Sequence, residues 1–172
     1  MKVTTKRGDD GCTILCKGCK EKKCSAKIEA VGDIDELISL LGVCSCYDDI
    51  TTIYLEEIQA ELSLICSELA LRGQNCITEK HVQKLDHYIN KVSSEVKIPQ
   101  YWFYGGDNKR ASWINYARAV TRRCERSVVK LYDEGHTKNK SLLIYLNRLS
   151  DLLYLLIFLS PLETGRVQCP KQ

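Results

Sequence analysis

Apolar residues recur at intervals of three or four along five successive segments of this 172-residue chain. That interval places them on one face of an α-helix, so each segment predicts a helix whose apolar face packs against the others. The expected helices begin near residue 27, near residue 50, after Thr78, after a loop at 97–110 and near Lys140, and they end near Gly42, before Gly73, before Pro99, at Gly135 and at Ser160. Because most connections between them are short, the pattern predicts an all-α protein, a five-helix antiparallel bundle.

Residues that break helices are scarce, because the chain contains only 3 Pro and 10 Gly. Its 44% of hydrophobic residues can supply one core, and its length is typical of one domain. We therefore expect a single domain over 1–172, divided into an N-terminal segment at 1–24, the helical bundle at 25–160 and a tail at 161–172.

Several classes of protein are excluded by simple physical limits. The longest apolar run, at 152–159, is far shorter than the roughly 20 residues that cross a bilayer. The first residues lack the apolar stretch of a secretion signal. A net charge of +3 is too small for a general nucleic-acid binder, whose affinity comes from releasing many counterions. These features predict a soluble cytoplasmic protein with neither a membrane nor a nucleic acid as its partner.

The segment at 1–24 has no helical period and predicts a loop or a short hairpin. Its glycines allow backbone N–H groups to close on an anion, and a lysine supplies positive charge, as in a phosphate cradle. The residues of this candidate cradle are Thr5, Lys6, Gly8, Asp9, Gly11 and Thr13. The Gly-Lys-Ser/Thr ending of a Walker loop is absent, so a plain turn is the alternative.

Four of the ten cysteines fall in the same segment, at Cys12, Cys16, Cys19 and Cys24. Four thiols are sufficient for zinc or an iron–sulfur cluster, but this spacing fits no standard site. In a chain so rich in cysteine and without a secretion signal, we interpret them as reduced, incidental thiols and assign no metal ligands.

The fourth expected helix carries a basic stripe. Arg118, Arg122 and Arg126 lie at intervals of four and therefore share one face, with Arg123 and Glu125 beside them. Polar residues also interrupt the most apolar stretch of the fifth helix, at Asn147, Arg148 and Asp151. Buried polar groups need partners, so the two helices predict a shared polar site. The alternative is a solvated face with local Glu–Arg pairs.

Acidic residues on the first helix, Glu29, Asp33 and Glu36, are spaced by four and three. They fit either a metal site or ion pairs with the arginines of the fourth helix. A ferritin-like di-metal bundle requires Glu-x-x-His motifs, and no histidine of this chain follows a glutamate at that spacing.

An aromatic run from Tyr101 to Tyr104 precedes Gly105 and Gly106 in the loop before the fourth helix. Such a run either covers one end of the core or caps a flat ligand.

Four ordered blocks of the sequence together resemble one family, the ATP:cob(I)alamin adenosyltransferases of the propanediol-utilisation type. The blocks are TKxGDxGxT at 5–13, EAxGxxDEL at 29–37, ARAVxRRxER at 117–126 and YLNRLSD at 145–151. Each block is weak alone, but their joint occurrence along nearly the whole of a five-helix chain is specific.

The resemblance implies a homotrimer with ATP held between adjacent subunits and the corrinoid in a neighbouring cleft. The residues that it places around ATP are Thr5, Lys6, Gly8, Asp9, Gly11, Thr13, Lys23, Arg122, Glu125, Arg126 and Asn147. The residues to which it gives catalytic roles are Arg122, Arg126 and Asn147, with Asp35 and Arg118 as an ion pair. The aromatic residue beneath the corrin would be Tyr101, Trp102 or Phe103.

In the reaction of that family, cobalt(I) attacks the 5′ carbon of ATP and triphosphate leaves, so the enzyme needs neither its own nucleophile nor a general base. The resemblance implies that Mg²⁺, Lys6, Arg122 and Arg126 neutralise the leaving group. It also implies a flavin-type reductase and an adenosylcobalamin-dependent enzyme as partners. The alternative is a non-catalytic relative that carries or senses nucleotide or cobalamin, but the complete loop and stripe favour the enzyme.

The chain departs from the family pattern at four positions, Lys27, Val31, Ile38 and Tyr104. The changes at Val31 and Ile38 affect local hydrogen bonds of the first helix. Counting back from the basic stripe favours Trp102 as the aromatic beneath the corrin, whereas counting from the glycine pair favours Tyr101.

Overall fold

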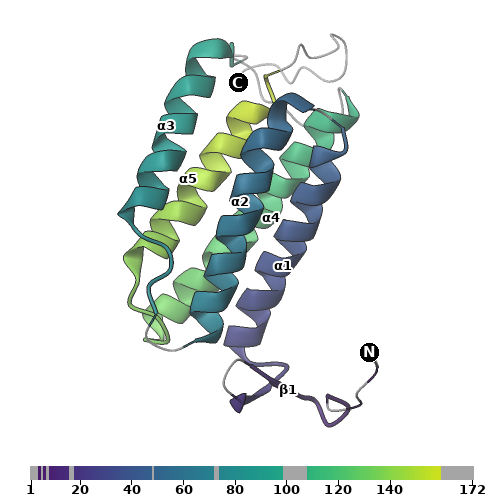
Figure 1. Cartoon of the computed structure of the whole chain (residues 1–172), viewed down its shortest axis with the longest axis vertical. Helices are drawn as coiled ribbons and strands as arrows, with labels where there is room; N and C mark the ends of the chain where they lie inside the picture. The colour runs from purple at the N-terminus through teal and green to yellow at the C-terminus, as the bar shows by residue number, and fades with distance from the viewer. Residues whose placement is uncertain are drawn as a thin grey trace, which may run out of the picture.

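The computed structural model describes residues 4, 6, 8–15, 18–47, 49–71, 74–98 and 108–159. Its elements are the strands β1 (Cys12–Ile14) and β2 (Lys20–Lys22) and the helices α1 (Ala26–Ser45), α2 (Asp49–Ala70), α3 (Glu79–Glu95), α4 (Lys109–Asp133) and α5 (Lys140–Leu156) (Figure 1). This mostly helical architecture confirms the predicted fold class. No helix among the described residues is both long and apolar enough to span a membrane.

Polar side chains just before the first turn explain where the helices begin. Ser25 Oγ accepts a hydrogen bond from the backbone N of Ile28 at 3.4 Å. The side chains of Asn108 and Asn139 likewise accept from backbone N–H groups in the first turns of α4 and α5. These caps satisfy N–H groups that have no partner within the helix. The helix expected near residue 27 begins at Ala26, and the helix expected after Thr78 begins at Glu79, so both predicted starts are confirmed.

One helix end agrees with the prediction and one differs. The first helix ends at Ser45, so Gly42 lies near its end as expected. Beside this glycine, Gln59 Nε2 of α2 donates to the carbonyl O of Ile38 at 2.9 Å, and a Cβ on Gly42 would lie 3.4 Å from that nitrogen, an ordinary contact. The last helix ends at Leu156, before the predicted Ser160. Gly135 (φ +75°) follows α4 as predicted.

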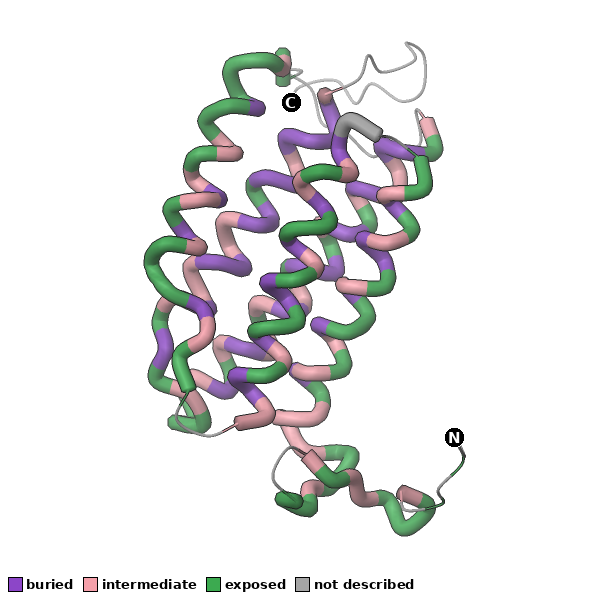
Figure 2. The backbone as a smooth tube through the Cα atoms, in the orientation of Figure 1, coloured by how far each residue is buried: buried purple, intermediate pink, exposed green. Residues whose placement is uncertain are grey.

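Successive helices run in opposite directions along the bundle (Figure 1). Helix α1 packs against α2 and α4, and α5 packs against α3 and α4. The buried residues line the facing sides of the helices (Figure 2). The large side chains fully enclosed there include Ile34, Leu37, Leu41, Leu62, Ile65, Ile114, Leu131 and Tyr145. The antiparallel bundle therefore follows the apolar spacing of the sequence.

The N-terminal segment forms an antiparallel hairpin of β1 and β2, in which Thr13 lies opposite Glu21. The hairpin lies beyond the N-terminal end of α1 (Figure 1). None of its described residues is buried, and the core of the bundle begins at Ala30 (Figure 2). The expected short hairpin is thus present and adds little to the core.

A buried arginine joins the start of α4 to the end of α5. Arg110 Nη1 donates to the carbonyl O of Leu156 at 2.8 Å, and its Nη2 donates to that of Ile157 at 3.1 Å. Only 7% of Arg110 is exposed. The last carbonyl groups of a helix lack partners within the helix and carry partial negative charge, so this cation stabilises the end of α5.

We expect Arg110→Met to lower the free energy of unfolding by about 2–4 kcal/mol, because it leaves two buried carbonyl groups without charged donors. For a protein of this size, that loss corresponds to a fall in melting temperature of about 5–15 °C. Thermal melts of Arg110→Met and of the control Lys109→Met, which changes the exposed neighbouring residue, provide the measurement. Equal melting temperatures for the two variants would show that the Arg110 contacts contribute nothing.

Candidate active site

The described residues of the predicted cradle form a tight turn before β1. The backbone N of Gly11 donates to Gly8 O at 3.3 Å, and Gly11 has a φ of +77°, which favours glycine. Lys23 joins the turn, because its backbone N donates to Gly11 O at 2.9 Å. Its Nζ lies 3.1 Å from the position that a Cβ on Gly8 would occupy. The absence of a side chain at Gly8 therefore leaves room for the ammonium group of Lys23 at the turn.

Two further features order this loop. Lys6 has a φ of 59°, in the left-handed region that residues other than glycine rarely adopt. Asp10 Oδ1 accepts from the backbone N of Cys12 at 3.1 Å, and its Oδ2 accepts from Lys20 Nζ at 2.6 Å. The hydrogen bond from Lys20 lowers the pKa of Asp10. The sequence analysis missed Asp10. Its one sequence signal is its position two residues before a strand, where an aspartate commonly forms an Asx turn.

A hollow of about 470 Å³ lies between α3, α4 and α5, on the face that carries the basic stripe. Its lining residues are Ile89, Arg118, Arg122, Ser150, Asp151, Tyr154 and Leu155. Two stripe arginines thus face a concave surface with apolar and aromatic walls, which is typical of a site for a ligand with both charged and flat parts. The sequence analysis missed Ile89, Ser150 and Tyr154, because apolar and small residues in a helix are ordinarily core.

Glu125 connects the stripe to the fifth helix. Arg122 Nη1 and Glu125 Oε2 form an ion pair at 2.6 Å. Their orientation does not meet the geometry of a hydrogen bond. Asn147 Nδ2 donates to Glu125 Oε1 at 3.1 Å. Only 16% of the Glu125 side chain is exposed, against 46% for Arg122. The structure therefore brings Arg122, Glu125 and Asn147 together, and the guanidinium of Arg122 stays accessible to an anion.

The predicted ion pair of Asp35 with Arg118 is not formed within this chain. Arg118 Nε donates to Asn115 Oδ1 at 3.0 Å, and Asp35 is exposed on α1. Asp33, two residues earlier, is the aspartate that contacts α4, through Arg123 and Ser127. Residues two apart in a helix point in nearly opposite directions, so Asp33 rather than Asp35 faces α4.

The acidic residues of α1 pair with arginine. Arg123 donates to both Asp33 and Glu36, with 3.1 Å between Arg123 Nε and Asp33 Oδ1. Within the part of the chain that the structure describes, no three His, Cys, Asp or Glu side chains form a group able to hold a metal ion. Pairing with an arginine of the fourth helix is therefore confirmed for Asp33 and Glu36, whereas Glu29 is exposed.

The cysteines of the hairpin are free thiols where the structure describes them. Cys12 is partly buried, and Cys19 and Cys24 are exposed. Cys16 lies outside the described residues, as do Thr5 and the aromatic residues Tyr101, Trp102 and Phe103. The interpretation of the cysteines as incidental and the register of the aromatic run both stay predictions.

Burial in the bundle raises the pKa of three thiols, to about 12 for Cys124 and to about 11 for Cys44 and Cys66. An unfolded thiol releases its proton near pH 9, so above that pH the folded state binds more protons than the unfolded state, and stability falls as pH rises. Between pH 8 and pH 10, each of these thiols should lower the free energy of unfolding by about 1.4 kcal/mol.

Urea unfolding at pH 8 and pH 10 measures this loss of stability. In Cys124→Ala the difference in unfolding free energy between the two pH values should be smaller by the contribution of one thiol. The matched control is Cys46→Ala, which changes an exposed thiol. A pH dependence of Cys124→Ala equal to that of the unmodified protein would contradict the assignment.

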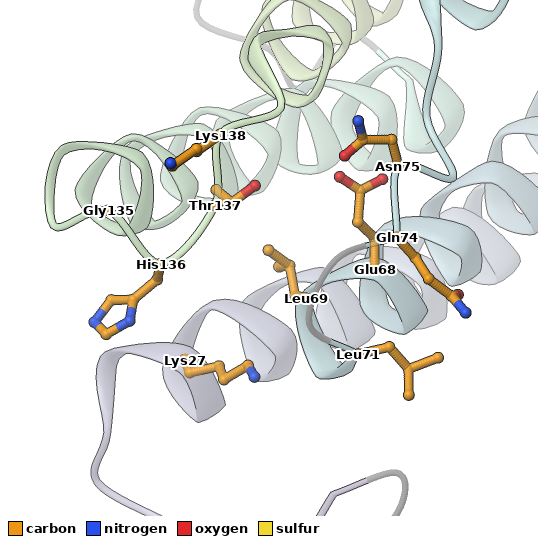
Figure 3. Close-up of a pocket in the computed structure, with 10 residues that line it drawn as sticks. All are labelled: Lys27, Glu68, Leu69, Leu71, Gln74, Asn75, Gly135, His136, Thr137 and Lys138. Atoms are coloured by element: carbon orange, nitrogen blue, oxygen red, sulfur yellow. The ribbon is translucent and has the colours of Figure 1, made fainter.

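A second hollow, of about 540 Å³, lies at the end of the bundle near the hairpin and has ten lining residues (Figure 3). Glu68 and Thr137 point into it, whereas Leu71 and Gln74 point away. The Glu68 carboxylate is fully used: Oε2 accepts from the backbone N of Cys76 and Ile77, and Oε1 accepts from Asn139 Nδ2 at 2.7 Å. This buried carboxylate therefore fixes the segment after α2 and the start of α5, and none of the predicted site residues lies here.

A search against protein families matches the description "Cobalamin adenosyltransferase" over residues 3–160. The chain belongs to the cobalamin adenosyltransferase family. The match covers the hairpin, the bundle and the loop before α4, so the four sequence blocks lie within one family domain.

Several relatives of this chain have names that agree with the family match. The corrinoid adenosyltransferase PduO of Salmonella typhimurium is 33% identical over 164 residues, which is 91% of this chain and 48% of that protein. The corrinoid adenosyltransferase of Bacillus subtilis is 35% identical, over 90% of this chain and 83% of that protein. This chain therefore spans about half the length of the Salmonella relative and most of the Bacillus relative.

A solved structure of the same family has the same fold. It is a variant PduO-type ATP:corrinoid adenosyltransferase from Lactobacillus reuteri, complexed with cobalamin and ATP. The two share 28% of their residues, with a TM-score of 0.82 over 91% of this chain and 92% of the other. The helical bundle of this chain thus has the same overall arrangement as that structure.

Proposed function

We propose that this protein transfers the 5′-deoxyadenosyl group of ATP to cob(I)alamin, which yields adenosylcobalamin and inorganic triphosphate. The observation that carries the proposal is the cluster of Arg122, Glu125 and Asn147 beside the hollow of α3, α4 and α5. The names of the family relatives, and the ATP and cobalamin bound to the Lactobacillus protein, support it.

The reaction asks the protein to position two substrates and to stabilise a leaving group. Cobalt(I) is itself the nucleophile, so a bond forms between cobalt and the 5′ carbon while the bond from that carbon to the triphosphate oxygen breaks. Triphosphate takes the electron pair of the broken bond. Arg122 and Arg126 present guanidinium groups whose fixed fork suits phosphate oxygens, and Lys6 and Lys23 add charge from the loop. Asn147 would lie at the nucleotide.

Magnesium would enter with ATP. Its preferred ligands are oxygens, and it commonly binds through substrate phosphates and few carboxylates. Asp9 of the loop is an exposed carboxylate, and the described residues include no preformed cluster of ligands. We therefore assign most of the coordination to the phosphate oxygens.

We propose a homotrimer as the active unit. The hairpin with the cradle lies beyond the N-terminal end of α1, and among the described residues no hydrogen bond or ion pair joins it to α4 or α5 (Figure 1). A site that needs both parts can form if the loop of one subunit meets the stripe of its neighbour. The same contact would allow Asp35 of one subunit to pair with Arg118 of the next, since the two do not meet within one chain.

The remaining partners follow from the chemistry. Making cobalt(I) requires an electron donor, for which a flavin-type reductase is suitable, and the product serves an adenosylcobalamin-dependent enzyme. One of Tyr101, Trp102 and Phe103 would cover the lower face of the corrin and exclude the lower cobalt ligand. The eight free thiols of the described residues fit a reducing compartment such as the cytoplasm.

The direct test is to mix the protein with ATP, magnesium and chemically reduced cobalamin under anaerobic conditions and to follow the absorption spectrum. We expect the spectrum of cob(I)alamin to be replaced by that of adenosylcobalamin, with one triphosphate released per product. Binding of both substrates without transfer would instead favour a carrier or sensor. Release of phosphate and diphosphate as primary products would contradict the proposed reaction.

A further inference from the structure

We propose that Asp33 is a positioning residue for the basic stripe of α4, and that it sets the direction in which Arg122 and Arg126 point. The proposal rests on the proposed function, because it assigns those arginines to the phosphates of ATP. Asp33 lies on α1 and does not line the hollow of α3, α4 and α5.

Three residues of α4 donate to this one aspartate. Arg123 Nε donates to Asp33 Oδ1 at 3.1 Å, and Ser127 Oγ donates to Oδ2 at 2.5 Å. Cys124 Sγ donates to the backbone carbonyl O of Asp33 at 3.1 Å. Only 15% of the Asp33 side chain is exposed. Both carboxylate oxygens and the carbonyl oxygen of Asp33 are thus used to hold a little more than one turn of α4.

The three donors alternate in sequence with the residues of the candidate site. Arg123 and Cys124 follow Arg122 directly, and Ser127 follows Arg126. At about 100° per residue, the donors are centred roughly 150° around the helix from the arginine stripe. Asp33 therefore contacts the face of α4 that lies nearly opposite the arginine stripe, and the stripe itself faces the hollow.

Apolar packing cannot supply this control by itself. Helices α1 and α4 pack against each other and otherwise bury apolar side chains such as Ile34, Leu37 and Val120, whose contacts are non-directional. Directional hydrogen bonds at three points fix the rotation of α4 about its axis. A rotation of about 20° would move a guanidinium by roughly 2 Å, and a misplacement of about 1 Å in a catalytic site is enough to cost roughly 100-fold.

Glu36 shares Arg123 but has a lesser role. Among the residues that the structure describes, Glu36 accepts from Arg123 alone, and 47% of its side chain is exposed, whereas Asp33 accepts from three groups. The pKa of Arg123 is raised first by its hydrogen bond to Glu36, although desolvation opposes this, and Asp33 adds to the rise. Without Asp33, Arg123 would therefore stay charged and would be bound only by the exposed Glu36. That single contact would not prevent α4 from rotating about its axis.

The test compares Asp33→Ala with Glu29→Gln, which removes one negative charge from the exposed side of α1 a turn earlier. ATP affinity is measured by calorimetry, and KM for ATP, KM for cobalamin and kcat are measured well below the melting temperature. We expect Asp33→Ala to weaken ATP binding and raise KM for ATP by about 10- to 100-fold, with KM for cobalamin changed far less. Glu29→Gln should match the unmodified protein.

A purely structural role for Asp33 would lower the melting temperature and leave ATP affinity unchanged in the folded variant, and that result would overturn the proposal. If Asp33→Ala does not fold, Ser127→Ala removes a single hydrogen bond and should weaken ATP binding about 3- to 10-fold, by about 0.7–1.4 kcal/mol. Unchanged affinity in Ser127→Ala would then overturn it. Rescue of part of the affinity by Asp33→Glu would support it further.

The calorimetric measurement separates this proposal from the proposed function. A protein that binds ATP but makes no adenosylcobalamin would contradict the proposed reaction, while the effect of Asp33→Ala on ATP affinity would still support or overturn the positioning role. A protein with no measurable affinity for ATP would overturn both.

Discussion

Removal of residues 1–24 is expected to abolish adenosyl transfer and to leave the helical bundle folded. The cradle and Lys23 are lost with this segment, so a bound triphosphate would lack the charge and the backbone N–H groups that the turn supplies. No described residue of the hairpin is buried, and the core begins at Ala30, so the melting temperature should change little. Turnover and a thermal melt of the shortened protein check both expectations.

A mixing experiment extends this prediction to the assembly. The shortened chain and Arg122→Ala are each expected to be inactive, one for lack of the loop and the other for lack of the stripe. If each site takes its loop from one subunit and its stripe from the next, co-expression of the two chains should restore activity at about one quarter of the sites. No recovery from mixed trimers would show that the loop serves the subunit to which it belongs.

Arg122→Lys is expected to lower turnover by about 30- to 1000-fold, equivalent to roughly 2–4 kcal/mol of transition-state stabilisation. Lysine keeps the charge but loses the planar fork that holds two phosphate oxygens. Because 46% of the Arg122 side chain is exposed and its ion pair with Glu125 lies on the same helix, the bundle should keep its melting temperature. Turnover, ATP affinity and a melt provide the measurement.

The control for Arg122→Lys is Lys130→Ala, which removes an exposed charge two turns further along the same line of α4. It should leave turnover unchanged, because Lys130 does not line the hollow. Normal turnover and affinity in Arg122→Lys would mean that the arginine only pairs with Glu125, and the assigned role would be rejected.

Local information explains most of what the sequence predicted correctly. The helix at Glu79–Glu95 was predicted from its apolar spacing and from Thr78, since periodicity and capping depend only on neighbouring residues. The end of α5 was predicted too late, at Ser160 instead of Leu156, for the opposite reason. There the carbonyl groups of Leu156 and Ile157 accept from Arg110 of α4, a contact between residues far apart in the chain.

Helix α4 shows most clearly what could not be predicted from the sequence. The sequence placed Arg118, Arg122 and Arg126 on one face, because a fixed turn of 3.6 residues fixes that relation. It did not show that Glu125 joins Arg122 to Asn147, or that Arg123 turns away from the stripe toward Asp33. It also left open whether Glu29, Asp33 and Glu36 bind metal or arginine, a question that depends on which helix packs against α1.

The sequence by itself determined the five helices, the faces that are buried and the residues of the loop and stripe, because each depends on interactions between residues a few positions apart. Only the tertiary structure decided the partners: Asp33 with α4, Arg118 with Asn115 and not with Asp35, Glu125 with Asn147, and a hairpin away from its own stripe. The physical reason is that an apolar face packs against any complementary face, whereas hydrogen bonds and ion pairs require the final rotation and position of both helices.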